Sequence, residues 1–230
     1  GLGDVYKRQI YIPPFASIVG AGKDKTKFNV TNNVVVFQTV NESSTPGNYA
    51  NDSSSTTINQ PRQIVMKDFT VATTQTTQPV LKLQSCKMSN FENIRITGPW
   101  TTGTAITRAN AGLELSSLSN VVCTQENKFD HVSVNGMSVG VVSDDDVYNN
   151  HFHCCYFTNL GQGVQFGQNT TLGSQGQTTG PSKNKFGFSE FKNIDREAIA
   201  IQNGSNNFST HNNFESVGNV GGTEGNAQYS

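Results

Sequence analysis

Short apolar runs separated by polar turn residues follow one another along the whole chain. A recurring unit starts with Asn, reaches a Phe at once or one residue later, and places mostly apolar residues three and five positions after that Phe. Residues two positions apart lie on one face of a strand, so each copy predicts short strands with one buried side. The five copies are Asn90-Phe91, Asn127-Lys128-Phe129, Asn150-His151-Phe152, Asn184-Lys185-Phe186 and Asn212-Asn213-Phe214.

A second short apolar run follows most copies, near 104–107, 137–142, 163–166 and 198–201. The spacing between the repeated phenylalanines is uneven, which disfavours propellers and leucine-rich arrays because their repeats have a fixed length. It suits a solenoid whose turns accept insertions. The pattern therefore predicts an all-β, right-handed, single-stranded parallel β-helix of about eight coils at about 25 residues each. Loop insertions are expected near 41–60 and 168–182.

Composition agrees with short strands and turns. The 230 residues include 22 Gly and 14 Phe, and only 14% are charged. A formal net charge of −1 leaves no basic patch for nucleic acid or an anionic membrane surface. No apolar run approaches the ~20 residues that cross a bilayer, so membrane insertion is not expected either.

The first nine residues differ from the pattern that follows. Gly1 to Gln9 stops abruptly before the strand-like Ile10-Tyr11-Ile12 and resembles translated adapter sequence at the ends of proteins from environmental assemblies. We expect 1–9 to be non-native and 10–230 to be a single β-helix domain, itself a fragment of a longer chain.

The segment from Ile10 to Thr26, which contains Ser17-Ile-Val-Gly-Ala-Gly22, resembles the first coil of pectate-lyase-like β-helices. Together with the Asn and Phe coils, 10–230 resembles the β-helical part of a tail fibre or tailspike of a tailed marine bacteriophage. The resemblance implies a structural protein of the virion tail that acts outside the cell, without a cofactor unless Ca²⁺ is bound. It also implies a homotrimer whose partners are a host cell-surface polysaccharide and other tail proteins.

Two other functions remain open on the same fold. One is a polysaccharide depolymerase, either a lyase or a glycoside hydrolase, and the other is a cellular adhesin or a secreted pectinase-like protein. A lyase of this family would carry acidic calcium ligands and a basic proton acceptor, but Arg62, Arg95, Arg108 and Arg196 are scattered and match no lyase motif. Enzyme activity is therefore uncertain and less expected than a structural role. Two solvent-facing carboxylates from neighbouring coils beside an aromatic platform would favour the enzyme.

Asp144, Asp145 and Asp146 form the densest acidic run and are the candidate catalytic or calcium-binding residues. The simpler interpretation, which we favour, is a solvated turn between coils. Trp100 and Tyr148 are candidate platforms for a sugar ring. For Trp100, packing of the indole against the base of a loop is the more ordinary expectation.

His151 and His153 are two residues apart, which places both imidazoles on one face of a strand. This spacing permits metal binding, but the sequence offers no evident third ligand, so we expect surface histidines and no metal site. The adjacent Cys154 and Cys155 should face opposite sides, so at most one is in the core. With Cys86 and Cys123, they are interpreted as small apolar residues rather than metal or redox groups.

Overall fold

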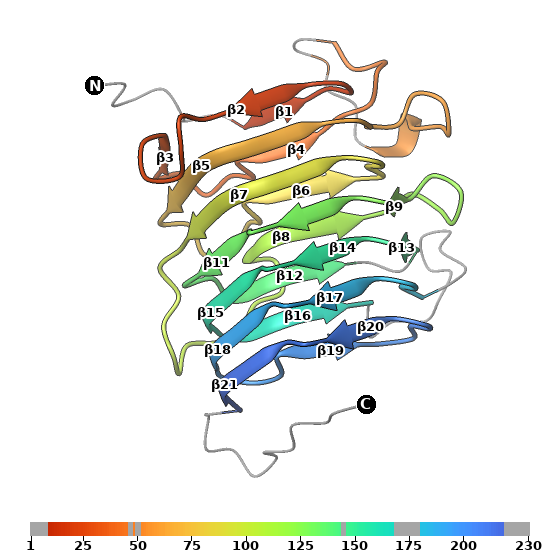
Figure 1. Ribbon diagram of the computed structural model, residues 1–230. Helices are drawn as coiled ribbons and strands as arrows, with labels where there is room; N and C mark the ends of the chain where they lie inside the picture. Colours follow the sequence, from red (N-terminus) through yellow and green to blue (C-terminus); the bar gives the residue numbers. More distant parts are fainter. Residues whose placement is uncertain (1–8, 46–47, 49–51, 144–145, 168–179, 219–230) are drawn as a thin grey trace.

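The computed structural model describes residues 9–45, 48, 52–143, 146–167 and 180–218. In these residues the chain winds into a parallel β-helix, with every pairing between named strands parallel, as the sequence predicts (Figure 1). The only helical element described is the 3-10 turn η1 (Asp52–Ser54). No helix in the described part of the chain is long and apolar enough to cross a membrane.

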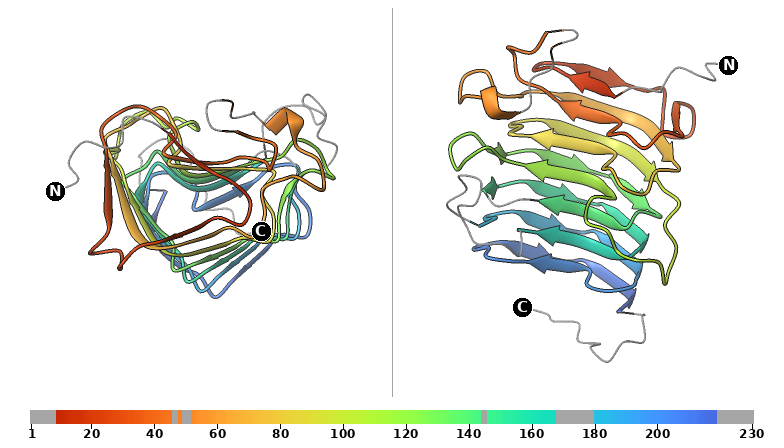
Figure 2. Two further views of the ribbon diagram at one scale, coloured as in Figure 1. Left: turned by 90° about the horizontal axis from the view of Figure 1, so that it is seen from above. Right: turned by 180° about the vertical axis from the view of Figure 1, so that it is seen from behind.

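Two long sheets form the walls of the solenoid (Figure 2). The seven-stranded sheet contains, in spatial order, β1 (Ile10–Ile12), β4 (Phe37–Thr39), β6 (Leu81–Gln84), β8 (Ala111–Ser116), β12 (Val139–Ser143), β16 (Gln162–Phe166) and β19 (Ile199–Ile201). The twelve-stranded sheet contains β2 (Ser17–Val19), β3 (Lys27–Val30), β5 (Val65–Thr73), β7 (Asn90–Thr97), β10 (Lys128–Asp130), β11 (Ser133–Asn135), β14 (His151–His153), β15 (Tyr156–Leu160), β17 (Lys185–Gly187), β18 (Glu190–Ile194), β20 (Phe208–Thr210) and β21 (Asn213–Val217). A third sheet pairs β9 (Thr124–Gln125) with β13 (Val147–Tyr148).

Each coil contributes one strand to the seven-stranded sheet, so the described residues form seven coils rather than the expected eight or so. Residues between strands take up chain length that adds no coil. Residues 98–110, between β7 and β8, are one such connection, and their course along the side of the stacked coils is visible in Figure 1.

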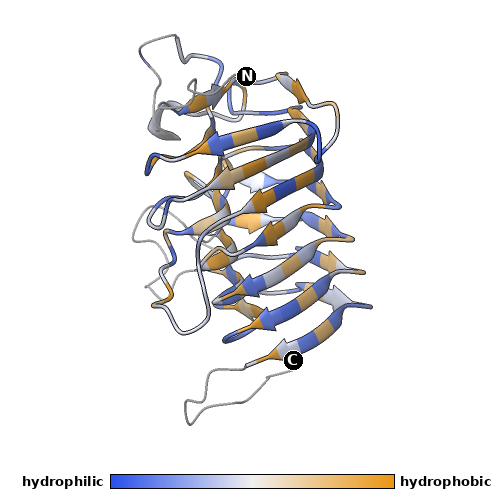
Figure 3. Ribbon diagram, turned by 90° about the vertical axis from the view of Figure 1, so that its left-hand side faces the viewer, coloured by the Kyte–Doolittle hydropathy of each residue, from blue (hydrophilic) through white to orange (hydrophobic). Residues whose placement is uncertain are grey.

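The interior is a continuous apolar column, and hydrophobic and hydrophilic positions alternate along many strands (Figure 3). Phe91, Phe129, Phe152 and Phe186 occupy one register position in successive coils. Their rings stack with centroids 5.0, 4.4 and 4.8 Å apart. The prediction that the repeated phenylalanines stack inside one shaft is therefore confirmed for these four.

The fifth predicted copy was placed in the wrong register. Ser209, not Phe214, pairs with Phe186, so the last unit reads Asn207-Phe208-Ser209. Phe214 instead stacks on Phe191, at 5.3 Å, in a second aromatic column. The error arose because a polar residue stands two positions before an apolar one at two places in a coil, as in Asn184 and Phe186 and again in Ser189 and Phe191.

A ladder of buried asparagines runs beside the phenylalanine stack. Asn127, Asn150 and Asn184 are fully buried, and each donates its side-chain amide to the side-chain oxygen of the next asparagine, ending at Asn207. Ser89, rather than the predicted Asn90, takes this position in the coil above. Such bonds satisfy the polar groups that a tight corner leaves without strand partners.

Candidate functional site

Charged, polar and aromatic side chains gather on the outer face of β7, β10, β14, β17 and β20. The residues directly before and after each buried Phe project outward, because side chains alternate along a strand. Strand register then aligns them into columns. The first column is Asn90, Lys128, His151, Lys185 and Phe208, and the second column is Glu92, Asp130, His153, Gly187 and Thr210.

A third line of side chains lies where each coil bends, directly after the residues of the second column. We call it the corner column, and its members are Asn93, His131, Cys154, Phe188 and His211. All five have a backbone φ between 50° and 53°, the left-handed region that non-glycine residues seldom adopt. The sharp turn at each of these residues ends the outward face.

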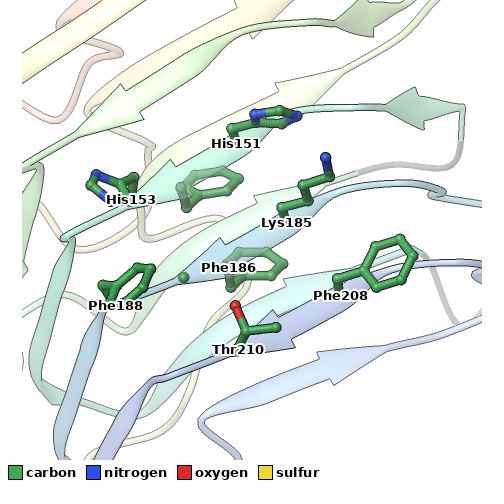
Figure 4. Close-up of a pocket in the computed structure, with 9 residues that line it drawn as sticks. His151, His153, Lys185, Phe186, Phe188, Phe208 and Thr210 are labelled. Atoms are coloured by element: carbon green, nitrogen blue, oxygen red, sulfur yellow. The ribbon is translucent and has the colours of Figure 1, made fainter.

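Two open hollows mark this face. One, of about 370 Å³, lies over Gly187, where the second column lacks a side chain (Figure 4). His153 and Lys185 border it, and the rings of Phe188 and Phe208, 58% and 52% exposed, lie at its two sides. The other, of about 460 Å³, is lined by Glu92, Lys128, Asp130 and the two histidines of β14.

Asp130 lies at the centre of a hydrogen-bonded cluster. Nδ1 of His153 is 2.8 Å from its Oδ1, and Nδ1 of His131 is 3.1 Å from its Oδ2. Partial burial opposes ionisation, but the hydrogen bonds from the two imidazoles outweigh it and hold the pKa of Asp130 below its ordinary value. Asp130 is thus a carboxylate at neutral pH.

His151 has the opposite surroundings. Burial disfavours its charged form, and repulsion from Lys185 and Lys128, its neighbours in the first column, adds to this effect. The pKa of the His151 imidazole is therefore lowered, and the ring is neutral at physiological pH.

The structure places two further groups that could act as metal ligands beside His153, which the sequence did not reveal. Ligand atoms of Asp130, His153 and Cys154 all lie within 4.8 Å of one another. Asp130 comes from the neighbouring coil, and Cys154 is the residue next in sequence to His153. The prediction that at most one of the two adjacent cysteines is in the core is confirmed, because Cys155 is fully buried and Cys154 is partly exposed.

Of the three acidic candidates only Asp146 is among the described residues, and it does not line either hollow. Asp144 and Asp145 are outside the described residues. Asp146 is 0% exposed and its Oδ1 accepts a 3.1 Å hydrogen bond from the hydroxyl of Tyr148, so it is not part of a solvated turn. Its backbone carbonyl accepts a bond from Ser117, which ties the segment to the coil above.

The two aromatic candidates are not brought together. Trp100 is half-buried in the connection from β7 to β8, where its indole N–H donates to the carbonyl of Ala105 at 3.4 Å. Tyr148 lies in β13, in the opposite turn of the coil, between β12 and β14. Neither lines a hollow described above.

Sequence reasoning missed Glu92, Asp130, Lys185, Phe188 and Phe208 as members of a site. A signal was available for three of them, since Glu92, Asp130 and Lys185 directly flank a repeated Phe and must therefore face outward. Phe188 and Phe208 do not directly flank a repeated Phe, so the pattern carried no such signal for these two residues.

No protein-family model matches the sequence, and a search of curated proteins finds no match. Among solved structures, the chain is similar to the catalytic domain of a GH87 alpha-1,3-glucanase in complex with nigerose, with a TM-score of 0.63 and 14% identity over 91% of this chain and 33% of that one. A protein of Geobacillus virus E2, ORF18, gives a TM-score of 0.31 at 13% identity, over 91% of this chain and 50% of that one. The chain thus spans about a third of the glucanase domain, and the likeness establishes a shared β-helical fold.

Proposed function

We propose that this chain is a β-helical segment of a phage tail fibre or tailspike, and that it binds a host-surface polysaccharide along the outer face of β10, β14, β17 and β20. One observation carries the proposal: the hollow over Gly187 combines polar groups with two exposed aromatic rings. Sugars present hydroxyl groups at their edges and C–H groups on their faces, so they need both kinds of contact.

The construction of the face suits such a ligand. Its strands are held from behind by the stacked rings of Phe129, Phe152 and Phe186, so the outward side chains sit on a rigid wall. A rigid, open surface loses little conformational entropy when an extended polymer binds along it. The glucanase of similar fold was solved with a sugar ligand, nigerose, and a sugar is the ligand we propose here.

The virion assignment rests on the resemblance of Ile10 to Thr26 and of the repeated coils to tail fibres and tailspikes. A homotrimer, contacts with other tail proteins and a location on the virion tail are parts of the same proposal. Calcium would be an accessory ion, and its effect is measured by carrying out the assays below with and without it.

Binding is tested with the full chain on a panel of bacterial capsular and lipopolysaccharide glycans. Phe208→Ala, which removes one ring at the side of the hollow, should weaken binding at least tenfold. Phe15→Ala is the matched control, since Phe15 is similarly exposed, at 56%, but lies outside both hollows. Equal affinities of wild type and Phe208→Ala, or equal losses in the two variants, would contradict the proposed face.

A polysaccharide depolymerase is the second candidate, and one observation favours it. Glu92 and Asp130 are paired in register on neighbouring coils and line the same hollow. Adjacent strands lie about 4.8 Å apart, close to the ~5 Å between the carboxyl groups of retaining glycosidases. The lowered pKa of Asp130 suits the ionised partner of such a pair, which would leave Glu92 as the acid.

The two functions are separated by following reducing ends, and the absorbance of unsaturated products, after incubation of the full chain with each glycan. Cleavage that disappears in both Glu92→Gln and Asp130→Asn, but persists in the exposed control Glu215→Gln, would establish the enzyme. Binding without cleavage would support the adhesive segment.

A further inference from the structure

Asp130, His153 and Cys154 meet at the corner of β14 and bring together a carboxylate, an imidazole and a thiol. Neighbouring residues in a regular strand point to opposite sides. Cys154 escapes this rule because its φ of 50° turns the chain, and its sulfur lies 3.7 Å from Nε2 of His153. The backbone corner therefore brings two consecutive side chains to one point.

Asp130 determines which nitrogen of His153 is available. Its carboxylate can only accept a hydrogen bond, so the 2.8 Å contact places a proton on Nδ1 of His153. The lone pair of the neutral ring is then on Nε2, the nitrogen that faces the sulfur of Cys154. A carboxylate that orients a histidine through its far nitrogen is the common arrangement behind metal-binding imidazoles.

The ring is also held from its other side. Phe188 contacts His153 edge to face at 5.6 Å between centroids, and Phe188 is itself stacked on His211 at 5.0 Å. His153 is thus positioned by the coil above through Asp130 and by the coil below through Phe188. A ligand held in place loses less entropy when it binds an ion.

The separation of the two ligand atoms matches a single ion. With metal–sulfur and metal–nitrogen bonds of about 2.3 and 2.05 Å, tetrahedral angles place the sulfur and nitrogen about 3.6 Å apart. The observed 3.7 Å between Sγ and Nε2 agrees with this value. A thiolate with an imidazole selects Zn²⁺ and related transition metals over Ca²⁺ and Mg²⁺, which prefer oxygen ligands.

We propose that Sγ of Cys154 and Nε2 of His153 bind a Zn²⁺-class ion, with Asp130 as the positioning residue and the remaining ligand positions open to solvent. The side chain of His153 is 57% exposed, so an ion there is accessible to water or to a further ligand. This inference does not depend on the proposed glycan function, because metal binding is measured without any glycan.

The probe is Co²⁺ added to the full reduced chain, since a cobalt–thiolate bond produces a charge-transfer absorption in the near ultraviolet. We expect one Co²⁺ per chain with this band, displaced by Zn²⁺. Cys154→Ser should abolish the band, and His153→Ala should weaken binding at least tenfold. Asp130→Asn should weaken binding about 10- to 100-fold while leaving the band in place at saturation.

His151→Ala is the matched control, because His151 lies on the same strand and the same face but makes no contact with Cys154 that the structure shows. It should bind Co²⁺ as the wild type does. All substituted side chains are at least partly exposed, and a thermal melt verifies that each variant is folded. The proposal is overturned by absence of the band in the wild type, by an unchanged affinity in His153→Ala, or by an equal loss in His151→Ala.

Discussion

The side-chain oxygen of Asn184 accepts two hydrogen bonds from Asn150 of the preceding coil, one from its side-chain amide and one from its backbone N–H, both at 3.1 Å. The same double contact joins Asn127 to Asn150 and Asn184 to Asn207. In each case the residue before the asparagine has a left-handed backbone, as in Asn149 with a φ of 49°. The ladder therefore satisfies the polar groups of one corner along four coils.

Loss of one asparagine from the ladder should destabilise the whole stack of coils. Asn150→Ala would remove the acceptor of the buried backbone N–H of Asn127 and of one N–H of its side-chain amide, and would remove one donor to the carbonyl of Thr124. We expect a decrease of about 3 kcal/mol in the free energy of unfolding, because each unsatisfied buried group costs about 1–3 kcal/mol. Urea titration followed by circular dichroism measures it. Asn29→Ala, at an exposed position of β3, is the control and should change little.

Phe152 should contribute far more to stability than Phe188. Phe152 is 1% exposed and stacked between two rings, whereas Phe188 is largely exposed. Replacing a buried Phe by Ala usually costs about 3–5 kcal/mol, and surface substitutions stay within about 0.5 kcal/mol. The same urea titration of Phe152→Ala and Phe188→Ala compares them. Similar losses in the two variants would contradict the assignment of the interior.

Gly187 offers a substitution that separates stability from binding. A Cβ at Gly187 would meet nothing closer than Oγ1 of Thr210 at 3.6 Å, so Gly187→Val fits, and a valine suits a strand better than glycine by up to about 1 kcal/mol. Its melting temperature should equal or exceed that of wild type, while glycan affinity should fall because the hollow is filled. Gly163→Ala is the contrasting variant, since its Cβ would lie 2.2 Å from the carbonyl of Ala198. It should be clearly destabilised.

The titration of His151 should show the influence of the first column. The group has an ordinary pKa of 6.5, and its lowered value in the folded chain means that protonation is harder there than in the unfolded chain. His151 therefore reduces stability as the pH falls below about 6.5. Lys185→Gln should raise the pKa of His151, as measured by NMR. It should not restore the ordinary value, because burial is the larger cause of the shift. Lys192→Gln, which alters a lysine paired with Glu215, should leave it unchanged.

Thiol reactivity should distinguish Cys154 from the other three cysteines. Burial is the main cause that raises the pKa of Cys123 and of Cys155 to about 12, and Cys86 is fully buried. Thiolates, not thiols, react with alkylating agents. Iodoacetamide at neutral pH should thus modify Cys154 alone in the folded chain and all four cysteines in denaturant, as mass spectrometry would show. Native labelling of Cys155 would contradict its position in the core.

Much of the fold could be predicted from the sequence. The alternation around Phe129 and Phe152 and the Asn before each were enough to predict stacked parallel coils, because a short strand with one apolar side is stable only when neighbours extend its sheet. The correct register of the last coil was not predictable, since Ser209 replaces the expected Phe and a second aromatic, Phe214, follows five residues later.

The candidate site depended on the tertiary structure. The sequence by itself determined that residues such as Asp130, His153 and Lys185 face solvent, because each directly flanks a buried Phe. The repeated phenylalanines already place Asp130 and His153 on successive coils, but only the tertiary structure decided that the two side chains meet, with Nδ1 of His153 at 2.8 Å from Oδ1 of Asp130. Only the left-handed corner at Cys154 brought its sulfur to the same point. These contacts arise from hydrogen bonding between strands distant in sequence, which local pattern does not encode.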